Sequence, residues 1–312
     1  MKRILVAVCG IVCYLIMAIS VNFYHNVYSV AGTGTGIASQ LLQYSEDNAL
    51  PPQEPRIDPI WHFVPGLKGM EVDYGLSYEN MNAAGAFDES LVVKKSVPYE
   101  LDPQEFRSEP IYKGNEKGDY VSLLINVAWG EQELNQMIEI LDRLDVKANF
   151  FFEGRYAQEH SYQVAKVYNQ GHIVGNHSYS HPTRWKSLDY DGYTDELVKT
   201  NDALTGITGQ PILYFAPPGG EFNDQVLKAA YDQGMYTILW TADTIDWKGG
   251  DAATLIGRVQ KKLQPGALIL MHPKPATVEA LEPLIDELKT QGYRFKTVHE
   301  IVHGTQLDCI NN

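Results

Sequence analysis

Cysteine is scarce in this chain, which has only 3 cysteines in 312 residues. Cys9 and Cys13 lie in an apolar N-terminal run, and Cys309 lies near the other end of the chain. The long stretch between these ends can therefore form no intrachain disulfide and offers no cysteine ligands for zinc. We expect its fold to rest on a hydrophobic core alone, which a domain of about 200 residues can supply.

Basic side chains are also few: 25 lysines and arginines stand against 39 acidic residues, which gives a formal net charge of −14. This balance excludes proteins that capture nucleic acid or anionic lipid electrostatically, because both need a basic surface. The chain also lacks the composition of collagen-like or disordered proteins, since 44% of its residues are hydrophobic and 21% are charged. The composition therefore indicates a globular protein with no nucleic-acid partner.

The N-terminus carries an almost uninterrupted apolar run from Ile4 to Phe23, preceded by Lys2 and Arg3. A helix of this length covers the roughly 30 Å hydrocarbon core of a bilayer. The basic flank predicts that the N-terminus stays inside and that the rest of the chain is exported. We therefore expect an extracytoplasmic protein anchored in the cell membrane. A cleavable signal peptide and a secreted product are the alternative, because Ala18 and Ser20 form a small-x-small pattern.

Changes in composition divide the rest of the chain. A stretch rich in Gly, Thr, Ser, Pro and acids is typical of a linker. The next stretch contains Trp61, Phe63 and Leu67 and is too apolar for a spacer, so it is interpreted as a small accessory segment. The predicted parts are an anchor or signal peptide (1–23), a linker (24–59), the accessory segment (60–116), the main domain (117–303) and a tail (304–312).

Apolar strands and amphipathic helices alternate from Tyr120 onward. After the first run, Leu134, Met137, Ile138 and Leu141 follow at helical spacing. The βα order predicts an α/β fold with a parallel sheet closed into a barrel. An open doubly wound sheet is the alternative, but no Gly-rich phosphate loop follows the first strand. The predicted strands are VSLLINVA, KANFFF, HIVG, PILYFA, MYTILW, ALILMH and YRFKTV.

Unusual polar residues recur directly after these strands, where barrel folds place their chemistry. His177 and His181 are four residues apart, so on a helical turn they would share one face and could hold a metal ion. His272 ends a buried strand and is a candidate proton donor, which Asp246 could orient and Trp247 could desolvate. Each residue also has a structural alternative. His177 and His181 could be exposed or capping histidines, His272 could be a hydrogen-bonded core histidine, and Asp246 could cap the next helix.

The order of these motifs resembles the polysaccharide deacetylases of the NodB-homology type, carbohydrate esterase family 4, whose fold is a distorted (β/α) barrel. The motifs are His-x-x-x-His, a Pro-Pro turn (APPGG), DTIDW and Leu-Met-His, in this order. The resemblance covers about residues 117–303 and includes VKANFFFEG and GYRFKTVHEI. The first motif, NVAWG, resembles the sporulation-associated subgroup of that family.

The resemblance implies hydrolysis of the N-acetyl group of amino sugars in a cell-wall polysaccharide, either peptidoglycan or a chitin-like chain. In the family a divalent metal, usually zinc, is held by Asp-His-His and activates water, a second aspartate is the base, and a histidine protonates the leaving amine. The matching positions are His177 and His181 (metal), His272 (acid), Asp246 (tuning of that acid), Trp247 (apolar wall), Leu270 (acetyl-methyl pocket) and the N–H of Gly219 (oxyanion).

Three positions depart from this pattern. The family motif Thr-Phe-Asp-Asp-Gly is replaced here by Asn126 to Gly130, so that Ala128 stands for the base and Trp129 for the metal-binding aspartate. Ala216 stands where an arginine normally pairs with that base. Because a positioned base contributes about 10²–10⁴-fold, we expect deacetylation to be weak or lost.

Two functions remain open. Zinc could bind through His177 and His181, with waters, Asn126 or Glu131 completing the site, and give a weak hydrolase. Alternatively, the groove could bind wall glycan without cutting it, as a pseudoenzyme that acts as a binding or scaffold protein. Trp129 could be simple buried packing in either case.

Overall fold

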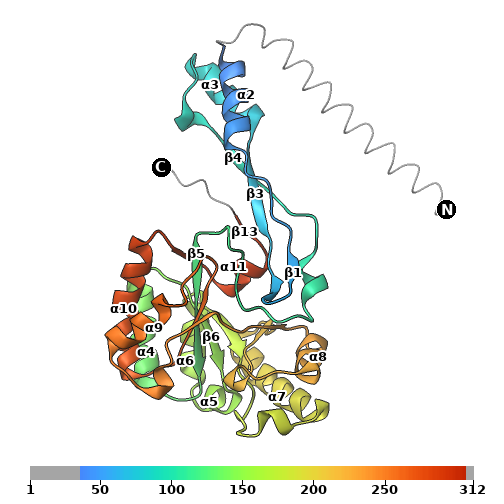
Figure 1. Ribbon diagram of the computed structural model, residues 1–312, viewed down its shortest axis with the longest axis vertical. Helices are drawn as coiled ribbons and strands as arrows, with labels where there is room; N and C mark the ends of the chain where they lie inside the picture. The colour runs from blue at the N-terminus through green and yellow to red at the C-terminus, as the bar shows by residue number, and fades with distance from the viewer. Residues whose placement is uncertain (1–35, 307–312) are drawn as a thin grey trace, which may run out of the picture. The chain divides into compact units, whose positions relative to one another are not determined.

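The computed structural model describes residues 36–306 (Figure 1). The expected anchor or signal peptide, Cys309 and most of the tail lie outside the described residues. Within residues 36–306, no helix is both long and apolar enough to cross a membrane. The chain divides into two compact units, and the larger one contains residues 52–68 and 98–307.

The smaller unit is built from the segment that ends at Pro51 together with residues 69–97. Part of the expected linker is helical here, because Leu41 is buried with Val72 and Met81 in one apolar cluster. β3 pairs antiparallel with β4 from Gly69 opposite Val97 onward. Its elements are α2 (Ile37–Asn48), β3 (Leu67–Val72, which begins in the larger unit), α3 (Tyr74–Ala84), η1 (Glu89–Leu91) and β4 (Lys94–Val97).

The larger unit is an α/β domain around a parallel sheet, in which strand order runs β10-β11-β5-β6-β7-β8-β9 and β12 also pairs with β5. The predicted α/β class is confirmed, and each predicted apolar run contains a strand. The strands are β5 (Tyr120–Val127), β6 (Asn149–Phe152), β7 (Ile173–Asn176), β8 (Tyr214–Phe215), β9 (Tyr236–Thr237), β10 (Ala242–Asp243), β11 (Leu268–Met271) and β12 (Arg294–Phe295).

The sheet is a curled half-barrel and differs in this from the closed barrel expected from the sequence. Within the described chain β9 and β10 end the strand order and do not pair with each other. The helices of this unit are α4 (Glu131–Arg143), α5 (Gly154–Glu159), α6 (Ser161–Asn169), α7 (Tyr190–Thr208), α8 (Asp224–Asp232), α9 (Ala252–Gln260), α10 (Pro275–Thr290) and α11 (Val298–Val302). The remaining elements are β1 (Arg56–Asp58), β2 (His62–Val64), β13 (Thr305–Gln306) and the short turns η2 (Pro103–Phe106), η3 (Trp185–Ser187), η4 (Pro218–Gly220) and η5 (Asp246–Lys248).

β5 is buried along its whole length because both of its faces are covered. Leu123 and Ile125 belong to the apolar cluster that contains the residues of α4, whereas Leu124 belongs to the cluster inside the curled sheet. Side chains alternate along a strand, so Asn126 lies on the same inner face as Leu124. The inner face of β5 therefore ends close to the residues that follow the carboxyl ends of the strands.

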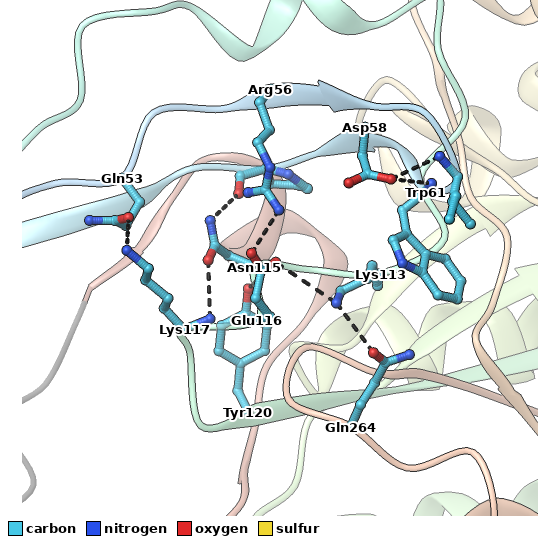
Figure 2. Close-up of polar contacts among 12 residues, drawn as sticks. Gln53, Arg56, Asp58, Trp61, Lys113, Asn115, Glu116, Lys117, Tyr120 and Gln264 are labelled. Carbon is cyan, nitrogen blue, oxygen red and sulfur yellow. Dashed lines mark hydrogen bonds and ion pairs between the residues drawn. The ribbon is translucent and has the colours of Figure 1, made fainter.

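A polar cluster at the amino end of β5 ties the β1–β2 hairpin to the domain (Figure 2). Arg56 pairs with Glu116 at 2.7 Å, and the nearly buried Lys113 lies 3.3 Å from Oε1 of Gln264 and 5.6 Å from the ring centre of Trp61. Burial lowers the pKa of Lys113, although Glu116 opposes this effect. The cluster therefore fixes a segment distant in sequence against the sheet.

Beneath this cluster, the hydroxyl of the fully buried Tyr120 accepts the backbone N–H of Asn115 at 2.8 Å. Tyr120→Phe leaves that N–H without a partner, and we expect a loss of about 1–3 kcal/mol in the free energy of unfolding. Tyr162→Phe is the matched control, since Tyr162 is 78% exposed and should change stability by less than about 0.5 kcal/mol. Urea unfolding measures both, and equal stabilities would contradict the assignment.

His172 is a buried titratable group away from the strand ends: it is 3% exposed, and its Nδ1 accepts the N–H of Ala148 at 3.1 Å. Burial lowers the pKa of His172 to about 4, with a smaller contribution from Lys147. The unfolded chain, with a pKa near 6.5, binds this proton first as the pH falls. Stability from His172 is therefore present above pH ~6.5 and is lost as the pH falls towards 4.

We expect His172→Asn, whose side-chain oxygen can still accept the Ala148 N–H, to flatten the acid side of the stability profile. Between about pH 6 and pH 5 the wild type should lose about 1 kcal/mol more than the variant. Urea unfolding at both pH values gives the change in the free energy of unfolding for each protein. A packing cost of the substitution is the same at both pH values and cancels from this change. Parallel profiles would show that His172 has the same pKa in the folded protein as in the unfolded chain.

Candidate functional site

The residues singled out in the sequence follow the carboxyl ends of neighbouring parallel strands. His177 comes directly after β7, and His272 directly after β11. Ala216 comes directly after β8, and Ala128 after β5. Because these strands are parallel, their carboxyl ends share one edge of the sheet, and the candidate residues gather there.

His177 is held rigidly by main-chain groups. Its N–H donates to the carbonyl of Phe152 at 2.9 Å, and its ring Nδ1 lies 2.7 Å from the carbonyl oxygen of Ala216. A carbonyl only accepts, so Nδ1 carries the proton and the Nε2 lone pair is left for another partner. Burial, reinforced by the neighbouring His181, lowers the pKa of His177 to about 3. The ring is therefore neutral, as a metal ligand must be.

His181 lies close to His177, with 5.0 Å between the ring centres, but not on the helical turn expected from the spacing. The segment is an irregular turn in which Ser178 and His181 adopt left-handed backbone angles, with φ of 62° and 45°. The hydroxyl of Ser178 accepts the N–H of His181 at 3.1 Å, and Glu196 accepts the N–H of Ser180 at 2.8 Å. Hydrogen bonds of the turn, and not helical periodicity, therefore bring the two rings together.

The two histidines do not make a complete metal site. Within residues 36–306 no group of three His, Cys, Asp or Glu side chains is placed to hold a metal ion. Glu131, a possible extra ligand, is instead 3.8 Å from Nδ1 of His160 and 62% exposed. Asn126 is buried, and its Oδ1 has no hydrogen-bond partner. The residues present therefore fall short of the three protein ligands that a catalytic zinc requires.

His272 and Asp246 form a tightly bonded pair. Nδ1 of His272 is 2.8 Å from Oδ1 of Asp246, whose Oδ2 accepts the N–H of His272 at 2.7 Å and the hydroxyl of Thr277 at 2.9 Å. Burial raises the pKa of Asp246, but the hydrogen bonds from His272 and Thr277 outweigh it and leave this pKa below its ordinary value. The ionised carboxylate fixes the ring of His272 with its Nε2 directed away from Asp246.

The loop that carries Asp246 is held by Arg258, which sequence reasoning missed. One guanidinium nitrogen, Nη1, donates to the carbonyls of Thr244, Ile245 and Gly249 at 3.0, 2.9 and 2.9 Å. Thr277 was missed as well. Both lie on helices that follow the motifs, at positions no catalytic pattern marks, so only the folded geometry identifies them.

Trp129 is not buried packing, and that interpretation was wrong. Its side chain is 43% exposed and stacks on His272, with 5.7 Å between ring centres and 11° between ring planes. Nζ of Lys274 lies 5.8 Å from the centre of the same indole ring. The position that would hold a metal-binding aspartate therefore presents an aromatic surface beside His272.

The other matched positions lie at the same edge. Leu270 is buried on the inner face of β11, and Trp247 is 55% exposed next to Asp246. Gly219 adopts a left-handed conformation (φ 61°) in the turn after Ala216. Ala216, where the resemblance predicts an arginine, positions His177 through its carbonyl.

The half-barrel fold, with histidines at the carboxyl ends of its strands, can now be compared with known protein families. The family model described as polysaccharide deacetylase matches residues 113–238. A peptidoglycan-N-acetylglucosamine deacetylase of Bacillus cereus is 31% identical over 266 residues, which are 76% of this chain and 93% of the relative. The chain belongs to the polysaccharide deacetylase family.

Three relatives are more similar to this chain than the deacetylase of Bacillus cereus is. The uncharacterized protein YlxY of Bacillus subtilis is 38% identical over 279 residues, which are 89% of this chain and 87% of that protein. The crystal structure of a wild-type pseudoenzyme of carbohydrate esterase family 4 from Bacillus anthracis is 38% identical, covers 88% of this chain and all of its own, and gives a TM-score of 0.80. A mutant of that pseudoenzyme, described as having restored enzymatic activity, is 39% identical with a TM-score of 0.79.

Gly130 sets the position of the Trp129 backbone and gives a test of this geometry. It caps α4 with φ of 80°, and a Cβ there would collide with the carbonyl oxygen of Pro273. We expect Gly130→Ala to cost about 2 kcal/mol in the free energy of unfolding. Gly206→Ala is the matched control: Gly206 lies inside α7 with open space around it, so the change should stabilise by about 0.5–1 kcal/mol. Similar effects in thermal unfolding would contradict the described turn.

Proposed function

We propose that this protein is a pseudoenzyme of the polysaccharide deacetylase family that binds N-acetylated cell-wall glycan without hydrolysing its amide bonds. The observation that carries the proposal is the exposed indole of Trp129, which stacks on His272 where the third metal ligand is expected. An indole carbon face cannot coordinate zinc, and its N–H is a donor only. The proposal thus follows from what occupies the site as well as from what it lacks.

The remaining side chains support binding more than chemistry. Ala128 offers no base, and a positioned base is worth about 10²–10⁴-fold in rate. The acid pair of His272 and Asp246 is intact, but it acts only after water has attacked the amide. Without a base and without a complete metal site, nothing in the described chain is placed to activate that water.

The relatives support the same proposal. The pseudoenzyme of Bacillus anthracis is similar over most of this chain, and the mutant with restored activity shows that such a scaffold can return to catalysis in that protein. Other relatives are named as deacetylases of peptidoglycan N-acetylglucosamine or N-acetylmuramic acid. We therefore propose a cell-wall polysaccharide as the partner of this chain. We also propose that residues 4–23 anchor it in the cell membrane, with secretion after cleavage as the alternative.

A weak zinc-dependent hydrolase is the second candidate, and the orientation of His177 favours it. The hydrogen bond to Ala216 leaves Nε2 of a neutral ring free, as a metal ligand requires. Metal content separates the two candidates. Stoichiometric zinc that is lost in His177→Ala would favour the residual hydrolase, whereas a metal-free protein that binds glycan would favour the pseudoenzyme.

Restoring the lost side chains tests whether the rest of the site is in working geometry. We expect the wild type to show little or no deacetylation of N-acetylglucosamine oligomers with added zinc. The triple variant Ala128→Asp, Trp129→Asp, Ala216→Arg should gain at least about 10²-fold, because base and ligand return together. Acetate release measures the rate, and circular dichroism checks folding. Family-typical turnover by the wild type would overturn the proposal.

The control is the same triple variant with His272→Gln, which removes the acid and should abolish the regained activity. A folded but inert triple variant would mean that His177, His181 and His272 are not arranged as in a working deacetylase. That result would leave glycan binding as the function to be tested by itself.

A further inference from the structure

Two exposed indoles stand beside the His272–Asp246 pair, and each lies under a lysine ammonium. Trp129 stacks on His272 and has Nζ of Lys274 at 5.8 Å from its ring centre. Trp247 follows Asp246 directly, is 55% exposed, and has Nζ of Lys248 at 4.7 Å from its ring centre. The edge of the sheet thus presents two aromatic surfaces, each with one positive charge.

Neither of these two ammonium groups is neutralised by the protein. Within residues 36–306, Lys248 and Lys274 form no ion pair, and each contacts the ring of one tryptophan. Some lysines elsewhere on this domain are neutralised by carboxylates: Lys186 pairs with Glu221, Lys199 with Asp195 and Lys228 with Asp232. The ammonium groups of Lys248 and Lys274 therefore bring two unpaired positive charges to the site, in a chain whose net charge is −14.

We propose that these two tryptophan–lysine pairs select an N-acetylated sugar that carries a free carboxylate, the muramic acid unit of a peptidoglycan strand without stem peptides, over a neutral chitin-like chain. The inference rests on the proposed function, because it names which glycan the same site engages. The indoles accept the C–H faces of the pyranose rings, since the face of an aromatic ring is negative and a sugar C–H is weakly positive. The ammonium groups of Lys248 and Lys274 then meet the lactyl carboxylate.

The negative charge of the rest of the protein disfavours binding of an anionic glycan anywhere except at these two lysines. A net charge of −14 repels an anionic chain from most of the surface, so an anionic glycan gains only where a cation is free. Exposed ion pairs contribute modestly, and two of them correspond to about a fivefold to twentyfold preference. Stacking on Trp129 requires no metal, so the binding should persist in a chelator.

The experiment measures binding of matched saccharides to the full-length protein by calorimetry in the presence of EDTA. The probes are a tetrasaccharide of alternating N-acetylglucosamine and N-acetylmuramic acid, the same tetrasaccharide with its carboxylates converted to amides, and the N-acetylglucosamine tetramer. We expect the wild type to bind the carboxylate form about fivefold to twentyfold more tightly than the amide form. That ratio should shrink as salt is raised.

Variants assign the effect to residues. Lys248→Gln with Lys274→Gln should bring the ratio close to one, while Lys261→Gln with Lys262→Gln, the same charge change at the end of α9, should leave it intact. Trp129→Ala should weaken the binding of all saccharides. An unchanged ratio in the Lys248 and Lys274 variant, or equal binding of both forms by the wild type, overturns the inference while glycan engagement stands. No binding of any saccharide overturns the proposed function as well.

Discussion

The parallel pairing of β5 with β11 on one side and β6 on the other is the constraint on which the site depends. It aligns the ends of these strands, so that Trp129 after β5 and His272 after β11 lie face to face. The apolar residues of β5 pack on both faces of the sheet and hold this register. A slip of one residue would move the inner face of β5, with Asn126, towards the helices. The apolar core therefore specifies the site geometry before any polar residue acts.

The candidate site keeps its shape although three side chains of the family pattern are missing, because main-chain groups and surviving residues hold the rest. The carbonyl of Ala216 orients His177 whatever its side chain is. Asp246, Thr277 and Arg258 hold His272 and its loop by hydrogen bonds that involve no residue of the first motif. Positioning and catalysis are thus physically separate here. A protein of this kind can lose the chemical step and still present the same ordered surface to a glycan.

Much of this arrangement could be predicted from the sequence, since continuous apolar runs mark buried parallel strands and motif order marks the site. Short elements could not be predicted: β10, for example, has only two residues, too few to show a hydrophobic pattern. The His177–His181 contact was expected for the wrong reason, since spacing cannot reveal the left-handed turn at Ser178. Periodicity also says nothing of a residue just beyond a strand, so Trp129 could be buried or exposed until the fold placed it. Contacts between distant segments decide such cases.

The missing side chains are energetically consistent with one another. A buried arginine at position 216 would be costly without the aspartate that it pairs with, and a lone aspartate at position 128 would be costly without the arginine. With alanine at both positions no buried charge is left unpaired there, and the remaining polar cost is the unpartnered Oδ1 of Asn126. The indole of Trp129 then covers His272, which keeps its bond to Asp246. The result is a surface of aromatic rings with two lysine ammonium groups beside it, and the proposed binding of sugars to this surface requires no activated water.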